Sequence, residues 1–148
     1  MARGYIFEVA EEKDDLLNIT ADHFYERLSE FHVDYVSDEI DVDVVTQNFL
    51  EMLQQYGFSV DFAEKSFVVT TDGKMQYFRS RFAAVQKMIT EMTLLTFATS
   101  ELYSLRSLIQ DNHGDVVCDP NGMCHDVDCW IRIADTHKYY IGGVVLMH

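Results

Sequence analysis

The chain has 148 residues, and its 25 acidic and 11 basic side chains give a formal net charge of −14. A hydrophobic content of 48% with a single proline provides enough apolar surface for a core, which argues against intrinsic disorder, and the length suits one domain spanning residues 1–148. The apolar runs are shorter than the ~20 residues of a membrane helix, no export signal opens the chain, and the basic surface needed for direct nucleic-acid binding is missing. We therefore expect a cytoplasmic protein that binds neither membranes nor nucleic acid directly.

The first half of the chain predicts a strand, two helices and a β-hairpin. Alternating side chains predict the strand at residues 4–10. Thr20 can cap a helix over residues 21–31, and Gly57 can close a second helix over residues 43–56. Residues 58–62 and 66–71 then predict the two strands of a hairpin with residues 63–65 as its loop.

Residues 74–92 give the strongest helix signal in the chain, and we expect this to be the central helix. Its apolar residues recur at helical spacing: Met75, Phe78, Phe82, Val85, Ile89 and Met92. Residues 93–99 could continue it or form a short buried strand. We favour a helix that bends near Ser100, where a further helix begins and runs to residues 112–114.

Strand patterns return at the end of the chain. Residues 115–118, 129–134 and 139–147 have β-type patterns, with turn residues at 119–122 and a loop at 135–137. The whole pattern predicts an α+β fold in which two or three helices pack on one face of a mostly antiparallel β-sheet.

The charge is distributed unevenly along the chain. Residues 1–64 contain 16 acidic and 3 basic side chains, a net charge of −13, whereas residues 65–112 carry +2 and residues 113–148 carry −3. On the helix expected at 21–31, Asp22, Glu26 and Glu30 would form one row of carboxylates about 6 Å apart, and Asp34 and Asp38 would extend it. This spacing approximates that of the phosphates along a nucleic-acid strand. The row therefore suggests a nucleic-acid mimic that occupies the basic groove of a DNA- or RNA-binding protein.

Two other interpretations of the acidic residues remain open. Charge runs commonly form solvated faces that keep a protein soluble. Calcium or magnesium binding has less support, because no complete Asp-x-Asp-x-Asp-Gly loop with a glutamate at its twelfth position occurs. Tyr25 and Tyr35 could provide aromatic anchors beside the carboxylates if the surface binds a partner.

Three cysteines and a histidine lie close together near the C-terminus. Cys118, Cys124, His125 and Cys129 have the ligand types that zinc prefers, although Cys-x5-Cys and Cys-x4-Cys are unlike the usual tight zinc knuckle. The odd cysteine count and the absence of an export signal favour reduced core or loop cysteines. The turn at 119–122 would allow Cys118 and Cys124 to approach each other.

The motifs of common enzyme classes are absent from the chain. It contains no glycine-rich phosphate loop, nucleophile elbow or His-Glu-x-x-His sequence, which favours a non-enzymatic protein without a cofactor. Arg79, Arg81 and Lys87 could pair with the acidic part of the same chain or of a second copy. The content of 8 tyrosines, 7 methionines and 10 phenylalanines makes a homodimer plausible.

In composition the chain resembles the small acidic inhibitors that phages and mobile elements direct against host nucleases, including anti-restriction and anti-CRISPR proteins. The leading hypothesis is thus an interaction module whose acidic face engages a basic nucleic-acid-binding protein. The alternative is a small metal-binding or catalytic domain centred on the cysteine and histidine cluster.

Overall fold

The computed structural model describes residues 4–99, 105, 109 and 114–148. A seven-stranded sheet has the order β3-β4-β7-β1-β5-β6, and β2 pairs with the end of β7. The pairing of β1 with β5 is parallel, and the other pairings are antiparallel. The fold is α+β, as the sequence predicts. The strands are β1 (Gly4–Ala10), β2 (Val36–Ser37), β3 (Ser59–Asp61), β4 (Ser66–Val68), β5 (Val116–Cys118), β6 (Cys124–Asp126) and β7 (Lys138–Met147).

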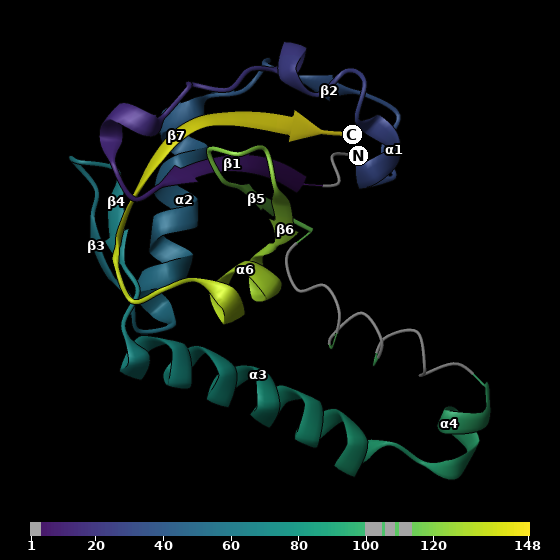
Figure 1. Cartoon of the computed structure of the whole chain (residues 1–148). Helices are drawn as coiled ribbons and strands as arrows, with labels where there is room; N and C mark the ends of the chain where they lie inside the picture. Colours follow the sequence, from purple (N-terminus) through teal and green to yellow (C-terminus); the bar gives the residue numbers. More distant parts are fainter. Residues whose placement is uncertain (1–3, 100–104, 106–108, 110–113) are drawn as a thin grey trace.

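The described helices differ in how they meet the sheet (Figure 1). They are α1 (Leu28–Phe31), α2 (Val42–Gln55), α3 (Thr71–Glu91), α4 (Leu94–Thr99) and α6 (Val127–Ile133), with 3-10 turns at Lys13–Asp15 and Ala21–His23. Helices α2 and α6 pack on one face, where Phe7 of β1 stacks on Phe49 of α2 with ring centroids 4.1 Å apart. Trp130 of α6 packs edge-on against Phe67 and Tyr139 of the sheet. None of the described helices is long and apolar enough to cross a membrane.

The opposite face of the sheet is covered by the chain between β1 and α2. We call residues 11–43, which extend into the first turn of α2, the acidic segment. Its apolar side chains Ile19, Phe24 and Phe31 are buried against Ile6 of β1 and Val145 of β7. The sheet is therefore enclosed between two layers, because successive side chains of β1 and β7 point to opposite faces.

Several predicted elements are confirmed. The strand at 4–10 is β1, the helix predicted at 43–56 is α2, and the predicted hairpin contains β3 and β4. The carboxylate of Asp41 accepts a hydrogen bond from the Val44 amide at the start of α2. Beyond its end, Gly57 has a φ of 103°, the left-handed conformation expected of a helix-closing glycine.

The helix predicted at residues 21–31 is wrong in its continuity. A 3-10 turn over Ala21–His23 is followed by a turn and by the single helical turn α1. The buried side chains Ala21, Phe24 and Phe31 reach the sheet from these short pieces. The even row of carboxylates along one helix face therefore does not form.

The strand predicted at residues 129–134 is also wrong, because this stretch lies mostly within α6. Val127, Trp130, Ile131 and Ala134 are buried, and their spacing of three, four and seven residues is that of one helix face. The predicted strand starts at Cys129 and so leaves out Val127, the first residue of this buried helix face.

Helix α3 confirms the predicted helix at 74–92 but is not central. Only Gly73 and Tyr77 are buried among its residues, and Figure 1 shows it running past the sheet and leading to α4. The bend comes at Met92, which has extended backbone, rather than near Ser100. Thr93 and Thr96 then exchange hydrogen bonds between side chain and amide at the start of α4. The further helix predicted from Ser100 lies almost entirely outside the described residues.

Candidate partner-binding surface

A buried carboxylate attaches the acidic segment to the sheet. Glu8 of β1 is 1% exposed, and its two oxygens accept hydrogen bonds from the amides of Leu17, Ile19 (3.2 Å) and Gly143 (3.0 Å). Asn18 has a φ of 54°, which asparagine tolerates better than most residues, and lies between the two donors of the segment. Three amides thus solvate a charge that burial would otherwise make costly.

Two glycines of β7 make room for this attachment. A Cβ at Gly142 would lie 2.3 Å from Oε1 of Glu8, and one at Gly143 would lie 2.3 Å from the carbonyl oxygen of Ile19. The consecutive glycines therefore allow the main chain of the acidic segment to approach the strand closely.

The outer surface of the acidic segment is rich in carboxylates. Residues 11–43 contain 12 acidic and 2 basic side chains, and all 12 acidic residues are exposed: Glu11, Glu12, Asp14, Asp15, Asp22, Glu26, Glu30, Asp34, Asp38, Glu39, Asp41 and Asp43. Among the described residues, lysine and arginine pair with only two of them, Glu30 with Arg27 and Asp43 with Lys65. The other cation of the segment, Lys13, lies 3.5 Å from Glu64, outside the segment.

The five carboxylates predicted to bind a partner have different surroundings. Asp22, Glu26 and Asp34 are exposed and make no ion pair with a described residue. Asp38 is exposed but accepts a hydrogen bond from the Ala21 amide (2.8 Å), which positions the 3-10 turn that holds Asp22. Glu30 is neutralised by Arg27, so the negative field is strongest away from this pair.

The two tyrosines proposed as anchors are also partly accessible. Tyr25 is 56% exposed. Tyr35 is 47% exposed, and its ring stacks on His148 with the centroids 4.7 Å apart. A tyrosine held by stacking provides contact area with little further loss of side-chain freedom on binding.

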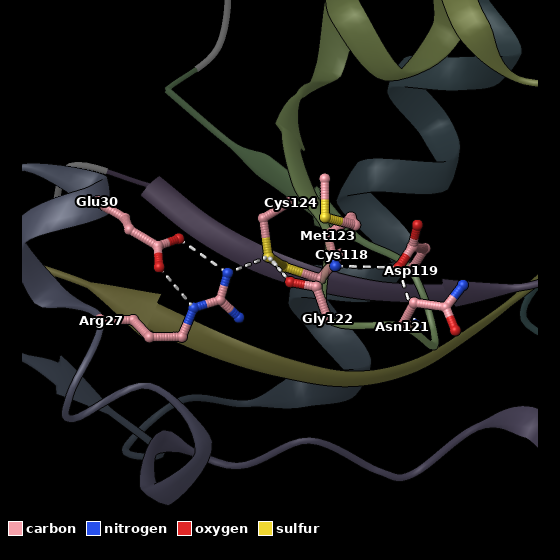
Figure 2. The surroundings of a disulfide bond; sticks show 8 residues. All are labelled: Arg27, Glu30, Cys118, Asp119, Asn121, Gly122, Met123 and Cys124. Carbon is pink, nitrogen blue, oxygen red and sulfur yellow. Dashed lines mark hydrogen bonds and ion pairs between the residues drawn. A yellow bond between two sulfur atoms is a disulfide. The ribbon is translucent and has the colours of Figure 1, made fainter.

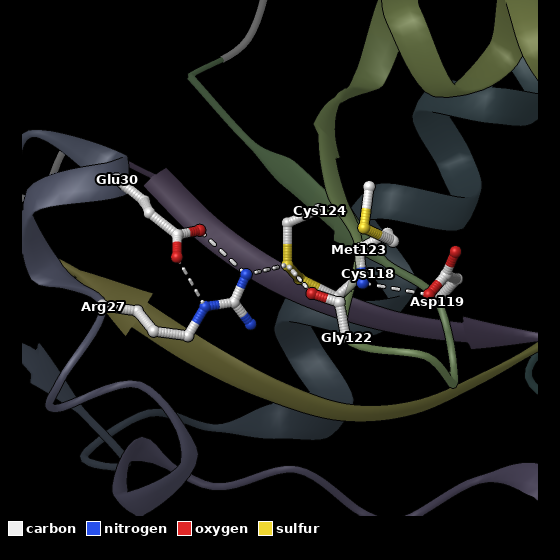
Figure 3. A network of polar contacts seen from close by, with 7 residues as sticks. All are labelled: Arg27, Glu30, Cys118, Asp119, Gly122, Met123 and Cys124. Atoms are coloured by element: carbon white, nitrogen blue, oxygen red, sulfur yellow. Dashed lines mark hydrogen bonds and ion pairs between the residues drawn. A yellow bond between two sulfur atoms is a disulfide. The ribbon is translucent and has the colours of Figure 1, made fainter.

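Arg27 joins the acidic segment to the cysteine cluster (Figure 3). Its Nε and Nη2 donate to the two carboxylate oxygens of Glu30 at 3.0 and 2.8 Å, and Nη2 also lies 3.7 Å from Sγ of Cys124. The hydrogen bond from Arg27 lowers the pKa of Glu30 below its ordinary value, while the same contact raises the pKa of Arg27. The guanidinium also lies over the rings of Phe24 and Phe31.

Cys118 and Cys124 form a disulfide between the directly paired strands β5 and β6 (Figure 2). The turn between the strands is closed by Asp119, whose side chain accepts hydrogen bonds from the amides of Asn121 (2.9 Å) and Met123 (3.0 Å). The expectation that these two cysteines are reduced is corrected by this bond. While they are joined, neither sulfur is a thiolate able to bind zinc.

His125 and Cys129, the other residues of the predicted metal site, lie beside the disulfide. Together with Cys124 and Glu30 they line a cavity of about 300 Å³. Within the described part of the chain, no group of three or more histidine, cysteine, aspartate or glutamate side chains could hold a metal ion. The oxidised structure therefore leaves the zinc hypothesis with two of its four ligands.

A buried polar cluster that sequence reasoning missed lies where α3 meets α6. Asp128 is 5% exposed, accepts a hydrogen bond from the Tyr77 hydroxyl and lies 3.2 Å from Arg81. Burial, followed by the contact with Asp128, raises the pKa of Tyr77 far above its ordinary value. These groups fasten the first turns of α3 to α6, which is a structural role. From the sequence, a charged residue such as Arg81 in an amphipathic helix looks the same whether it faces solvent or pairs with a buried carboxylate.

Comparisons of the chain with known protein families, with curated proteins and with solved structures found no match. The chemistry of the surface itself is therefore the basis for a functional proposal.

Proposed function

We propose that the protein is a binding module whose acidic segment docks into the basic nucleic-acid site of another protein. The observation that carries the proposal is the exposure of all 12 carboxylates of residues 11–43 alongside only 2 cations, both of which already have carboxylate partners. Such a surface attracts a lysine- and arginine-rich groove by the electrostatics that attract a phosphate backbone.

The attachment of the segment supports a binding role. Hydrogen bonds to Glu8 and buried aromatic side chains fix the acidic segment against the sheet, although the segment contains little regular secondary structure. A surface that is already ordered loses less conformational entropy when it binds. Like charges held close together oppose folding, so the fold gains no stability from this density of carboxylates.

The proposal depends on charge density and not on a regular repeat. Because residues 21–31 do not form one helix, the carboxylates are not spaced evenly as phosphates are. We therefore expect the module to compete with nucleic acid for a basic groove without reproducing its contacts one by one.

The test uses immobilised protein and competition by nucleic acid. Proteins from a lysate of the native host are bound at low salt and then eluted with duplex DNA or RNA, and the eluted proteins are identified by mass spectrometry. The variant Asp22→Lys with Glu26→Lys removes two carboxylates that have no cationic partner among the described residues. We expect it to lose the proteins that nucleic acid elutes from the wild type, with affinities that weaken as salt rises.

A matched control separates a specific surface from net charge. Glu51→Lys with Glu91→Lys makes the same change in net charge at exposed positions on α2 and α3, outside the acidic segment. This control should retain the same proteins as the wild type. Equal loss in both variants, or retention that nucleic acid does not reverse, would refute the proposal.

The alternative function, a metal site, has one supporting observation. Cys124, His125 and Cys129 line the same cavity, so reduction of the disulfide would return a thiolate to this place. Elemental analysis of protein purified under reducing conditions tests it. Stoichiometric zinc, lost in Cys129→Ser, would favour this alternative, and its absence would eliminate zinc.

A further inference from the structure

Helix α3 has an apolar pattern that the described part of the chain leaves partly exposed. Six apolar residues follow one another at intervals of three, four, three, four and three: Met75, Phe78, Phe82, Val85, Ile89 and Met92. The first five lie within α3 and form a heptad pattern, with Met75, Phe82 and Ile89 at a positions and Phe78 and Val85 at d positions, and Met92 is the residue that ends the helix. We call these six residues the α3 seam.

The a positions of the α3 seam face solvent. Met75, Phe82 and Ile89 are 57%, 63% and 55% exposed, whereas Phe78 is partly buried against the core and lies beneath the guanidinium of Arg132. The exposed surface continues into α4, where Leu94 and Leu95 are 84% and 72% exposed. A helix of a monomeric protein normally turns its apolar stripe toward the core.

We propose that the α3 seam is a self-association surface, and that its occupant is the α3 seam of a second copy of this chain. A heptad pattern favours a helix as the partner, because its a and d side chains pack into the spaces between the side chains of a facing helix. A twofold pair also matches each seam with an identical one, so that one surface explains both sides of the interface.

The α3 seam and the neighbouring helix α4 together expose enough apolar area for a stable pair. The exposed apolar side chains Met75, Phe82, Ile89, Leu94, Leu95 and Phe97 are each at least half accessible. At roughly 200 Å² for a large apolar residue, the three residues of the α3 seam present about 350 Å² and the three residues of α4 about 400 Å² per chain, and the two helices together come close to the ~800 Å² that each partner contributes to a standard interface.

Charge selects an antiparallel arrangement. The start of α3 is fastened to the sheet and α6 by the Lys74 contact with the Ala134 carbonyl and by the pairing of Arg81 with Asp128. A parallel pair would place two strongly acidic bodies side by side, since residues 1–64 carry −13 and residues 113–148 carry −3. An antiparallel pair puts them at opposite ends of helices ~30 Å long, well beyond the ~8 Å over which physiological salt screens charge. Helix α3, which would lie between them, has four basic and two acidic side chains, a net charge of +2.

The mass of the full-length protein in solution tests the proposal. Light scattering coupled to size-exclusion chromatography, from about 1 to 200 μM, should give twice the monomer mass of 17.2 kDa at the upper concentrations. Phe82→Glu with Ile89→Glu places charges at two a positions, and we expect it to remain monomeric or to associate at least tenfold more weakly. The matched control, Ser80→Glu with Thr90→Glu, changes exposed positions outside the α3 seam by the same charge and should dimerise as the wild type does.

Two further results decide between occupants and orientations. Circular dichroism must show equal helix content in both double variants. This result excludes unfolding as the reason why a variant fails to dimerise. In a Cys129→Ser background, mixing Met75→Cys with Met92→Cys should give a disulfide-linked dimer that neither protein forms alone. A monomeric wild type at all concentrations would overturn the proposal and indicate that the α3 seam is covered within its own chain or by a different protein. Linkage of Met75→Cys to itself would overturn the antiparallel arrangement.

Discussion

The anchoring of the acidic segment predicts a large effect for Glu8→Gln. The substitution preserves the shape of the side chain but replaces one acceptor oxygen with an amide group that donates. The carboxylate accepts from three amides, two of them at Oε1 and one at Oε2. In the variant, the carbonyl can keep the two bonds at one oxygen, while the new amide faces the Leu17 amide with donor against donor.

The magnitude follows from this loss. A hydrogen bond to a charged group contributes about 1.5–3 kcal/mol, an unsatisfied buried donor costs about 1–3 kcal/mol, and the two remaining bonds weaken because their acceptor is neutral. The variant no longer buries a charge, which offsets part of this. We expect the free energy of unfolding to fall by about 2–3 kcal/mol, and Tm to fall by about 5–10 °C for a chain of this size.

Two assays check the Glu8→Gln prediction. Urea unfolding measures the loss of stability, and hydrogen exchange should show faster exchange at the Leu17 and Ile19 amides than in the rest of the sheet. Glu12→Gln is the control, because Glu12 is exposed and its change should stay within about 0.5 kcal/mol. A Glu8→Gln protein as stable as this control, with unchanged exchange, would refute the role of Glu8 as the anchor.

Three other substitutions test separate parts of the structure. Asp128→Asn should lower the free energy of unfolding by about 3–5 kcal/mol in urea, because it removes the buried negative charge that faces Arg81, whose side chain is 14% exposed; a loss below about 1 kcal/mol would contradict the buried pair. Gly143→Ala should cost about 1–3 kcal/mol in the same assay, since the added Cβ would overlap the main chain of the acidic segment, and wild-type stability would contradict that close approach. Arg27→Gln should raise the pKa of Glu30 toward its ordinary value in an NMR titration. Because the wild-type pKa is lowered by folding, the contribution of the pair to stability is present above the ordinary carboxyl range and is lost as pH falls through the lowered pKa; an unchanged titration would show that Arg27 does not hold Glu30.

Local sequence patterns were sufficient where an element is defined by its own residues. The strand at 4–10 follows from alternation, and helix α2 follows from its apolar stripe and from a glycine that accepts positive φ. The same holds for the hairpin and for the α+β class, because period and turn chemistry act between residues close in sequence. The existence of α3 was equally evident from its apolar spacing, but its place outside the core was not. The same apolar spacing occurs whether the helix packs against its own chain or against another.

The candidate surface was predictable in charge and not in shape. The sequence alone shows that 16 of the 25 acidic residues fall within residues 1–64. It could not show that residues 21–31 do not form one continuous helix, because Phe24 and Phe31 can be buried against the sheet from short turns as well as from a helix. The presence of Glu8 among apolar strand residues and the Gly142-Gly143 pair were the available signals for the anchor.

Composition and periodicity determined an acidic α+β protein whose negative charge lies early in the chain, since these properties belong to residues close in sequence. Only the tertiary structure decided which charges are neutralised. Lys65 pairs with Asp43, and Arg81 pairs with Asp128, across separations that no local pattern specifies, whereas Arg27 and Glu30 are only three residues apart. Electrostatic and packing energies depend on distance in space, and that distance is set by the folding of the entire chain.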